Sequence, residues 1–178
     1  MNIFYLSENV KECAEWHVDK HCVKMILEYA QMLSTAHRVL DGDEYADEKN
    51  LYKLAHKNHP STIWVRSSSL NYQYLFNLFC ELCDEYTRRY KKIHMTDSKL
   101  RVALAMTPRA LTEVRSEFTE PPQCMPEECK VSGDSIQAYH NYYREHKKSF
   151  AKWYKSKTKG PYWFYQDVID LDTYPLFH

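Results

Sequence analysis

The feature that most constrains this chain is a helical hydrophobic period from Val10 to about Leu40. At about 3.6 residues per turn, its apolar side chains share one side of a helix: Val18, Cys22, Met25, Ile26, Tyr29, Leu33 and Ala36. Ser7 or Asn9 can cap its start, Asp41-Gly42-Asp43 ends it, and a break near Val18-Asp19 fits the pattern. The period therefore predicts a long first helix with one buried face.

The middle of the chain also favours helices. Ser61 after Pro60 opens a second helical stretch, which a cap among residues 67–69 restarts and which reaches about Lys92. Residues 41–60 are polar and irregular, with one short helix expected around Asn50–His56. Asp97 can cap another short helix that ends before Pro108.

The last third begins with three prolines in residues 116–130, which predict a loop. Asp134, with Gln137 three residues later, forms a capping box for a last helix that reaches about Lys155. Lys159-Gly160-Pro161 ends that helix, and an irregular tail rich in aromatic residues follows. We predict a single compact all-α domain over residues 1–178, with long first and last helices.

Composition narrows the possible functions. The chain has 178 residues and 3 glycines, which leaves no Gly-rich phosphate loop or dinucleotide fingerprint. Lys and Arg total 24, as do Asp and Glu, so overall charge alone cannot hold nucleic acid. No secretory signal or membrane-length apolar run is visible, and no membrane partner is expected.

The cysteines allow two interpretations. Cys80-x2-Cys83 and Cys124-x4-Cys129 could together bind zinc, but the first pair lies in a helical, apolar pattern. Free cysteines in such patterns behave as small hydrophobic residues. We therefore expect core thiols in a reducing cytoplasm, with no metal and no other cofactor.

Polar residues gather on one stripe of the first helix, about 120° wide: His17, Lys20, His21, Lys24, Glu28, Gln31 and Thr35. The stripe could be a solvated face. It could instead be an acid–base or anion-binding site, because two histidines and two lysines surround one carboxylate. His17-x3-His21 with Glu28 could also bind a metal.

Two further clusters could bind a ligand. His59 before Pro60 suits a helix cap or an anion contact, with Arg66 and Asn71 nearby, although the same residues could form a polar loop held by Trp64. In residues 144–159, seven cations face one acid, Glu145, and alternate with aromatic residues. That mixture suits a nucleic acid, although it also fits a solvated helix face with its aromatic residues packed inward.

These residues carry a resemblance to a known family. His21 and Glu28 are seven residues apart on the first helix, and Trp153-Tyr154-Lys155 follows near the C-terminus. In this they resemble the phage pyrimidine-dimer DNA glycosylase/AP-lyase family of small, all-helical proteins. The resemblance implies that Glu28 is the catalytic carboxylate and that Trp153, Tyr154 and Lys155 contact the substrate. We add Lys152 from the basic segment to the substrate-binding residues.

The family's nucleophile does not carry over directly. In the family, a small second residue is exposed after Met removal and its α-amine attacks the sugar, whereas Asn2 favours retention of Met1. The family's helix arginines would fall on Leu27 and Gln31. The Met1 amine remains one candidate nucleophile. Lys20 and Lys24 are the others, because positive charge on the neighbouring His17 and His21 would disfavour their ammonium forms.

Three hypotheses follow. The first is a DNA N-glycosylase with β-lyase activity on a modified or damaged base, in which Glu28 stabilises an oxocarbenium-like sugar. The second is an enzyme for a free nucleotide or small phosphorylated metabolite, bound by the same face with Gln31, His59, Arg66, Asn71 and Arg109. The third is a non-catalytic module that sequesters a nucleotide or binds a host protein. DNA or a nucleotide is the expected partner, in the host cytoplasm if a phage encodes the chain.

Overall fold

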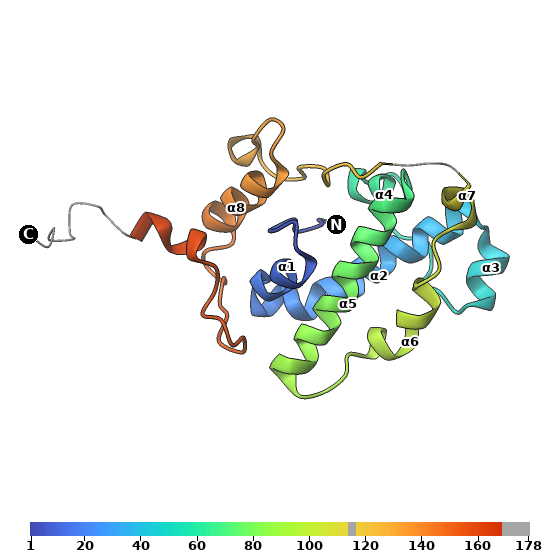
Figure 1. Cartoon of the computed structure of the whole chain (residues 1–178), viewed down its shortest axis with the longest axis horizontal. Helices are drawn as coiled ribbons and strands as arrows, with labels where there is room; N and C mark the ends of the chain where they lie inside the picture. The colour runs from blue at the N-terminus through green and yellow to red at the C-terminus, as the bar shows by residue number, and fades with distance from the viewer. Residues whose placement is uncertain (114–116, 169–178) are drawn as a thin grey trace, which may run out of the picture.

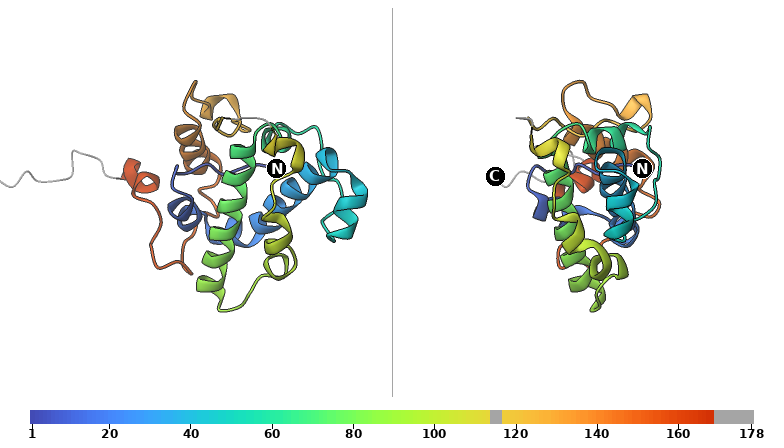
Figure 2. Two further views of the ribbon diagram at one scale, coloured as in Figure 1. Left: turned by 45° about the vertical axis from the view of Figure 1, so that its right-hand side comes forward. Right: turned by 90° about the vertical axis from the view of Figure 1, so that its right-hand side faces the viewer.

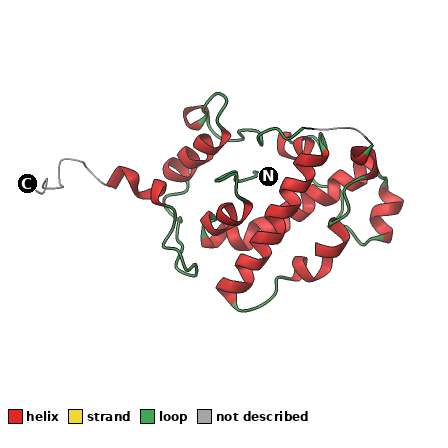
Figure 3. Cartoon of the chain, viewed as in Figure 1, coloured by secondary structure: helices red, strands yellow, loops and turns green. Residues whose placement is uncertain are grey.

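The computed structural model describes residues 1–113 and 117–168, and within these ranges it contains helices and loops but no strand (Figures 1 and 3). The predicted all-α class is confirmed. The α-helices are α1 (Val10–Trp16), α2 (Asp19–Leu40), α3 (Asp43–Glu48), α4 (Pro60–Val65), α5 (Ser69–Tyr90), α6 (Met95–Leu104), α7 (Arg109–Thr112) and α8 (Ser135–His146). Two 3₁₀ helices cover Glu127–Cys129 and Tyr162–Val168.

Helices α2 and α5, of 22 residues each, form the centre of the molecule. They pack against each other, while α1 covers α5 and α4 and α6 each contact both (Figures 1 and 2). Their apolar stripes meet in a core that excludes water from Ile26, Leu33, Leu75 and Leu82. Burial of such side chains stabilises the fold by about 1.5–3 kcal/mol each.

The helix boundaries follow local sequence signals where a polar side chain is placed to cap them. Asn9 accepts hydrogen bonds from the N–H groups of Lys11 and Glu12 at the start of α1. Ser68 caps α5 and Asp134 caps α8, as predicted. The expected break near Val18-Asp19 is also confirmed, because α1 ends at Trp16 and α2 begins at Asp19.

Two short helices differ from the prediction. Residues 50–56 form no helix, and α3 precedes them instead. The reason is Arg38, whose buried guanidinium bonds the carbonyls of Leu51 and Tyr52 and so takes the acceptors that a helix there would use. At α6 the capping side chain is His94, whereas Asp97 lies in the first turn and binds Arg101.

The last helix is shorter than predicted. α8 ends at His146, and residues 147–155 form turns and extended chain rather than helix. The Lys152 carbonyl accepts from the Asp19 N–H at 2.8 Å, and the Trp153 Nε1–H donates to the Trp16 carbonyl at 2.9 Å. These contacts with the α1–α2 junction require the chain to turn back, which a continuous helix could not do.

The tail after Pro161, predicted to be irregular, instead starts with regular structure. Its first residues form the 3₁₀ helix Tyr162–Val168, in which Trp163 stacks on His140 with 3.7 Å between ring centroids. Gly160 adopts φ +93° before it, and a Cβ at that position would lie 2.7 Å from the Trp153 ring. Residues 169–178 of the predicted tail lie outside the described residues.

The N-terminal segment runs through the middle of the molecule, between α8 and α5 (Figure 1). Residues Ile3 to Leu6 are all buried. Phe4 packs against Tyr139 and Tyr143 of α8, while Tyr5 packs against Tyr74 of α5. This short apolar stretch therefore joins the two halves of the fold.

None of the described helices is both long enough and apolar enough to cross a membrane.

Candidate active site

His21, in the first turn of α2, lies beneath Phe4, whose ring stacks on it with 4.2 Å between centroids. Its Nδ1 is 2.9 Å from the Tyr143 hydroxyl. Its other ring nitrogen, Nε2, has no hydrogen-bond partner among the described residues. Burial and the surrounding positive charges lower the pKa of His21 to about 2, so the ring is neutral.

Three lysines surround this neutral imidazole. The charges of Lys147, Lys24 and Lys20 each contribute to the low pKa of His21. The Lys20 Nζ lies 4.9 Å from the Phe150 ring centroid, and the Lys147 Nζ lies 4.6 Å from that of Tyr142. Attraction between each ammonium group and the aromatic ring beneath it holds Lys20 and Lys147 in place near His21.

Glu28 supplies a carboxylate to the same surface. Its Oε2 lies 3.9 Å from the Lys24 Nζ, one turn earlier on α2, and its side chain is 18% exposed. Gln31, three residues further on, is half-buried on the same side of α2. We call Lys20, His21, Lys24, Glu28 and Lys147 the α2 cluster, which combines amines, an imidazole and a carboxylate.

His17 does not join this cluster. It caps the C-terminus of α1, outside α2, and is completely buried. Its Nδ1 donates to the Cys13 carbonyl and its Nε2 accepts from the Tyr29 hydroxyl, both at 2.7 Å. Burial lowers the pKa of His17 to about 4. Both ring nitrogens are therefore occupied in the core, with no room for a ligand.

The metal interpretations gain no support. Among the described residues, no three side chains of His, Cys, Asp or Glu are placed to hold a metal ion. All six cysteines are free thiols, and burial raises the pKa of Cys13 to about 11 and that of Cys80 to about 11. Such thiols pack as small apolar groups.

His59 caps α4, where its Nδ1 accepts from the Ser61 N–H at 3.1 Å. Burial and the positive amine of Met1 lower the pKa of His59, so that amine lies near α4. Phe4 meanwhile lies on His21 of α2, and three residues span only about 10 Å. The N-terminal segment therefore runs from Phe4, which covers His21 of the α2 cluster, to the Met1 amine, whose charge acts on His59. The sequence analysis missed this segment, whose only signal was the apolar run at residues 3–6.

Arg66, at the C-terminal end of α4, has no partner among the described residues. Its Nη1 is buried without a hydrogen bond, and burial lowers the pKa of its guanidinium. The buried Thr62 Oγ1, four residues earlier on the same face, is also unsatisfied. An anionic ligand would supply the partner that this partly buried guanidinium lacks. Asn71 differs, because it holds the Trp64 carbonyl and the backbone of Thr119.

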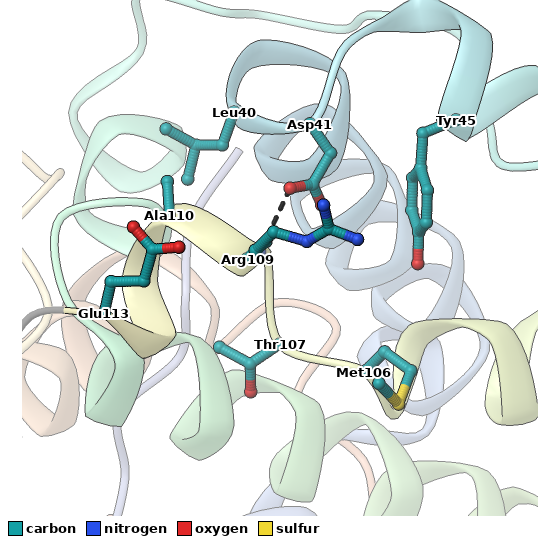
Figure 4. Close-up of a pocket in the computed structure, with 8 residues that line it drawn as sticks. All are labelled: Leu40, Asp41, Tyr45, Met106, Thr107, Arg109, Ala110 and Glu113. Atoms are coloured by element: carbon teal, nitrogen blue, oxygen red, sulfur yellow. Dashed lines mark hydrogen bonds between the residues drawn. The ribbon is translucent and has the colours of Figure 1, made fainter.

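Arg109 lies elsewhere. Its backbone N–H donates to Asp41 at the far end of α2, and it lines a pocket of about 520 Å³ with Tyr45 and Met106 (Figure 4). Asp41 follows Lys24 by 17 residues, or about 25 Å of helix. The structure therefore does not bring Arg109 together with the α2 cluster.

The aromatic-basic segment 152–155 lies at the N-terminal end of α2. Trp153 is buried and anchors the segment, whereas Tyr154 is 80% exposed. The Lys152 Nζ lies 5.5 Å from the Tyr154 ring centroid, and the Lys155 N–H donates to Asp19. Tyr154, Lys152 and Lys155 are thus exposed, and the bond from Lys155 to Asp19 places their segment next to Lys20, the first residue of the α2 cluster.

Comparison with known proteins identifies the class. A family model described as pyrimidine dimer DNA glycosylase matches residues 1–98, more than half of the chain. The chain belongs to this family, as the resemblance at His21 and Glu28 suggested. Membership supports a DNA glycosylase function, a role in DNA repair and a DNA substrate. No curated protein and no solved structure matches the chain.

Proposed function

We propose that this protein is a DNA N-glycosylase with β-lyase activity that works from the α2 cluster. The observation that carries the proposal is the grouping of amines, a neutral imidazole and Glu28 on one surface of α2, inside the family-matched residues. An amine attacks C1′ of the damaged nucleotide, and the N-glycosidic bond breaks as the base leaves. The resulting imine then allows loss of a C2′ proton and elimination of the 3′ phosphate.

Glu28 has two tasks in this reaction. Its carboxylate stabilises the oxocarbenium-like sugar while the base departs, and it then accepts the C2′ proton. His21 lies one turn before Lys24 on α2, and we assign its unpartnered Nε2 to a hydrogen bond with the sugar or its phosphate. Its low pKa keeps it uncharged at neutral pH.

Two amines are the main candidates for the nucleophile. The Lys24 Nζ lies 3.9 Å from the Glu28 Oε2, so this amine is next to the proposed catalytic carboxylate. The Met1 amine lies by His59, and the buried segment at residues 3–6 holds it in place. Lys20 is a third candidate, on the same face as Lys24.

DNA is held by local charge rather than by net charge, which is zero. The unpartnered guanidinium of Arg66, at the C-terminal end of α4, suits a backbone phosphate. We assign His59 and Gln31 to further contacts with the substrate. Lys152 and Lys155 contact further phosphates, and Tyr154 stacks on a base once the damaged nucleotide has left the helix.

Borohydride trapping on a duplex with an abasic site tests the proposal. The wild-type protein should form a covalent adduct, and Glu28→Gln should slow its formation by about 10²- to 10⁴-fold. Glu44→Gln, which changes an exposed carboxylate on α3, is the matched control and should trap normally. Loss of the adduct in Lys24→Ala, or after acetylation of Met1, identifies the amine. Absence of any wild-type adduct would refute the lyase activity.

The balanced charge of the chain favours a second candidate, an enzyme for a free nucleotide. The salt dependence of binding distinguishes the two candidate functions. Duplex binding should weaken steeply as salt rises, whereas pocket binding of a nucleotide should weaken only modestly.

A further inference from the structure

A basic pocket lies outside the α2 cluster, where α1, the end of α5 and residues 155–158 meet. Its volume is about 420 Å³. Cations from all three segments line it: Lys11, Arg88, Arg89, Lys91, Lys155 and Lys157. The proposed glycosylase chemistry uses none of them except Lys155, so the pocket needs an explanation of its own.

The two arginines belong to the wall of the pocket. Glu85 binds Arg89 through Oε1 at 2.7 Å and Arg88 through Oε2 at 2.8 Å. The buried Arg89 also donates to the carbonyls of His17 and Glu15, at 2.8 and 2.9 Å. These bonds fix the wall and neutralise Glu85.

The lysines are not neutralised in this way. Lys11, Lys91, Lys155 and Lys157 form no ion pair within the described part of the chain, and Glu15 is the one remaining carboxylate that lines the pocket. Among the described residues, the pocket is thus lined by four unpaired lysines and by one unpaired carboxylate, that of Glu15. In a chain whose charges balance overall, this is a local positive excess.

The third wall adds two hydroxyl groups. The hydroxyls of Ser156 and Thr158 lie 3.1 Å apart, and Ser156 also contacts Glu85 at 3.5 Å. The Lys155 N–H is tied to Asp19, whose carboxylate also binds Arg89 at 3.2 Å. Asp19 therefore connects the pocket to the first turn of α2, two residues before His21.

We propose that this pocket binds a phosphate group. Lysines from three segments line one pocket, and their ammonium groups provide the charge and the donors that phosphate oxygens require. The phosphate can come from the backbone of a DNA duplex held by the α2 cluster or from a free phosphate compound. The proposal does not depend on glycosylase activity.

A paired-variant experiment tests it. Lys11→Gln/Lys157→Gln removes one cation from each of two walls and leaves the arginine scaffold intact. Lys49→Gln/Lys99→Gln is the matched control, because both lysines are exposed and line a different pocket around Asp47. Binding of an undamaged labelled duplex is measured by anisotropy over a range of salt, and inorganic phosphate is titrated by calorimetry.

For backbone phosphates, the first variant should bind the duplex about 10-fold more weakly, and the slope of log K against log salt should fall by about 1 to 2. For a free phosphate compound, phosphate affinity should fall while duplex binding stays unchanged. In either case the control should match the wild type. If the first variant matches the wild type in both measurements, the proposal is wrong. Borohydride trapping is scored separately, so its failure would leave this result intact.

Discussion

The two ends of α2 each hold a buried histidine next to a tyrosine hydroxyl, yet they are bonded differently. At the C-terminal end, His37 lies 2.6 Å from Asp41 through Nδ1 and 2.8 Å from the Tyr72 hydroxyl through Nε2. That hydroxyl donates to the Leu104 carbonyl at 2.8 Å. At the N-terminal end, His21 bonds only Tyr143, and its other nitrogen is unpartnered among the described residues.

This difference distinguishes a purely structural histidine, His37, from a histidine in the candidate active site, His21. Both ring nitrogens of His37 are bonded, Nδ1 to the Asp41 carboxylate and Nε2 to the Tyr72 hydroxyl, which in turn donates to Leu104. Every polar group there has a partner. Around His21 the lysines outnumber the carboxylates, and polar capacity is left for a ligand. The fully bonded polar groups at the C-terminal end of α2 stabilise the fold, whereas the unpartnered polar groups at its N-terminal end are available to a ligand.

The largest expected effect concerns the segment that closes the N-terminal end. Trp153→Ala should lower the free energy of unfolding by about 3–5 kcal/mol, because it removes a buried ring and its bond to Trp16. The neighbouring Tyr154→Ala should change stability by less than about 0.5 kcal/mol. It should instead weaken binding to single-stranded DNA by about 1–3 kcal/mol. Urea unfolding and anisotropy measure the two; equal destabilisation by both variants would contradict the assignment.

The histidines themselves give the next comparison. His37→Gln should cost about 3 kcal/mol of stability, because Asp41 and Tyr72 both lose a buried hydrogen-bond partner, and should leave borohydride trapping unchanged at saturating DNA. His21→Gln should cost only about 1 kcal/mol and slow trapping by about 10²-fold. If both variants affect stability and trapping alike, the two ends of α2 do not differ as described.

Acid should destabilise the core near the N-terminal end. Burial lowers the pKa of His17 to about 4 and that of His21 to about 2, from 6.5. Below pH 6.5 the unfolded chain therefore binds protons that the folded chain cannot, and the free energy of unfolding falls. The two groups together should remove about 2 kcal/mol between pH 6.5 and 5.5. His17→Gln should reduce that loss by about half in urea titrations at the two pH values; an unchanged loss would show that His17 titrates normally.

The smallest expected effect is at Arg66. Arg66→Gln should raise stability by about 0.5–1 kcal/mol, because it removes a desolvated charge without a partner. The same change should lower the salt slope of duplex binding by about 1, through loss of one phosphate contact. Lys49→Gln is the control for charge. A loss of stability in Arg66→Gln would show that the guanidinium is already satisfied in the folded protein.

Local signals in the sequence were sufficient for part of the fold. The caps at Asn9, Ser68 and Asp134 and the break before Asp19 depend on residues within one turn, so their pattern can be read directly. The end of α8 could not be predicted, because it depends on bonds between Lys152 and Asp19 that are distant in sequence.

The candidate site was predicted in the same uneven way. Helical spacing correctly grouped Lys20, His21, Lys24 and Glu28 on α2, because they lie within one helix. The same spacing placed His17 beside them, but the break turns His17 into the core. The closeness of the Met1 amine to His59 depends on the burial of residues 3–6 under α8, which no local pattern records.

The buried segment at residues 3–6 also has a consequence for the order of folding. Phe4 packs against Tyr139 and Tyr143, which leave the ribosome more than 130 residues after it. Contacts so distant in sequence form late and slow the folding of a helical protein. A growing chain that contains only the family-matched residues 1–98 would leave Phe4 and His21 without the helix that covers them. The site is therefore completed only after α8 has been made.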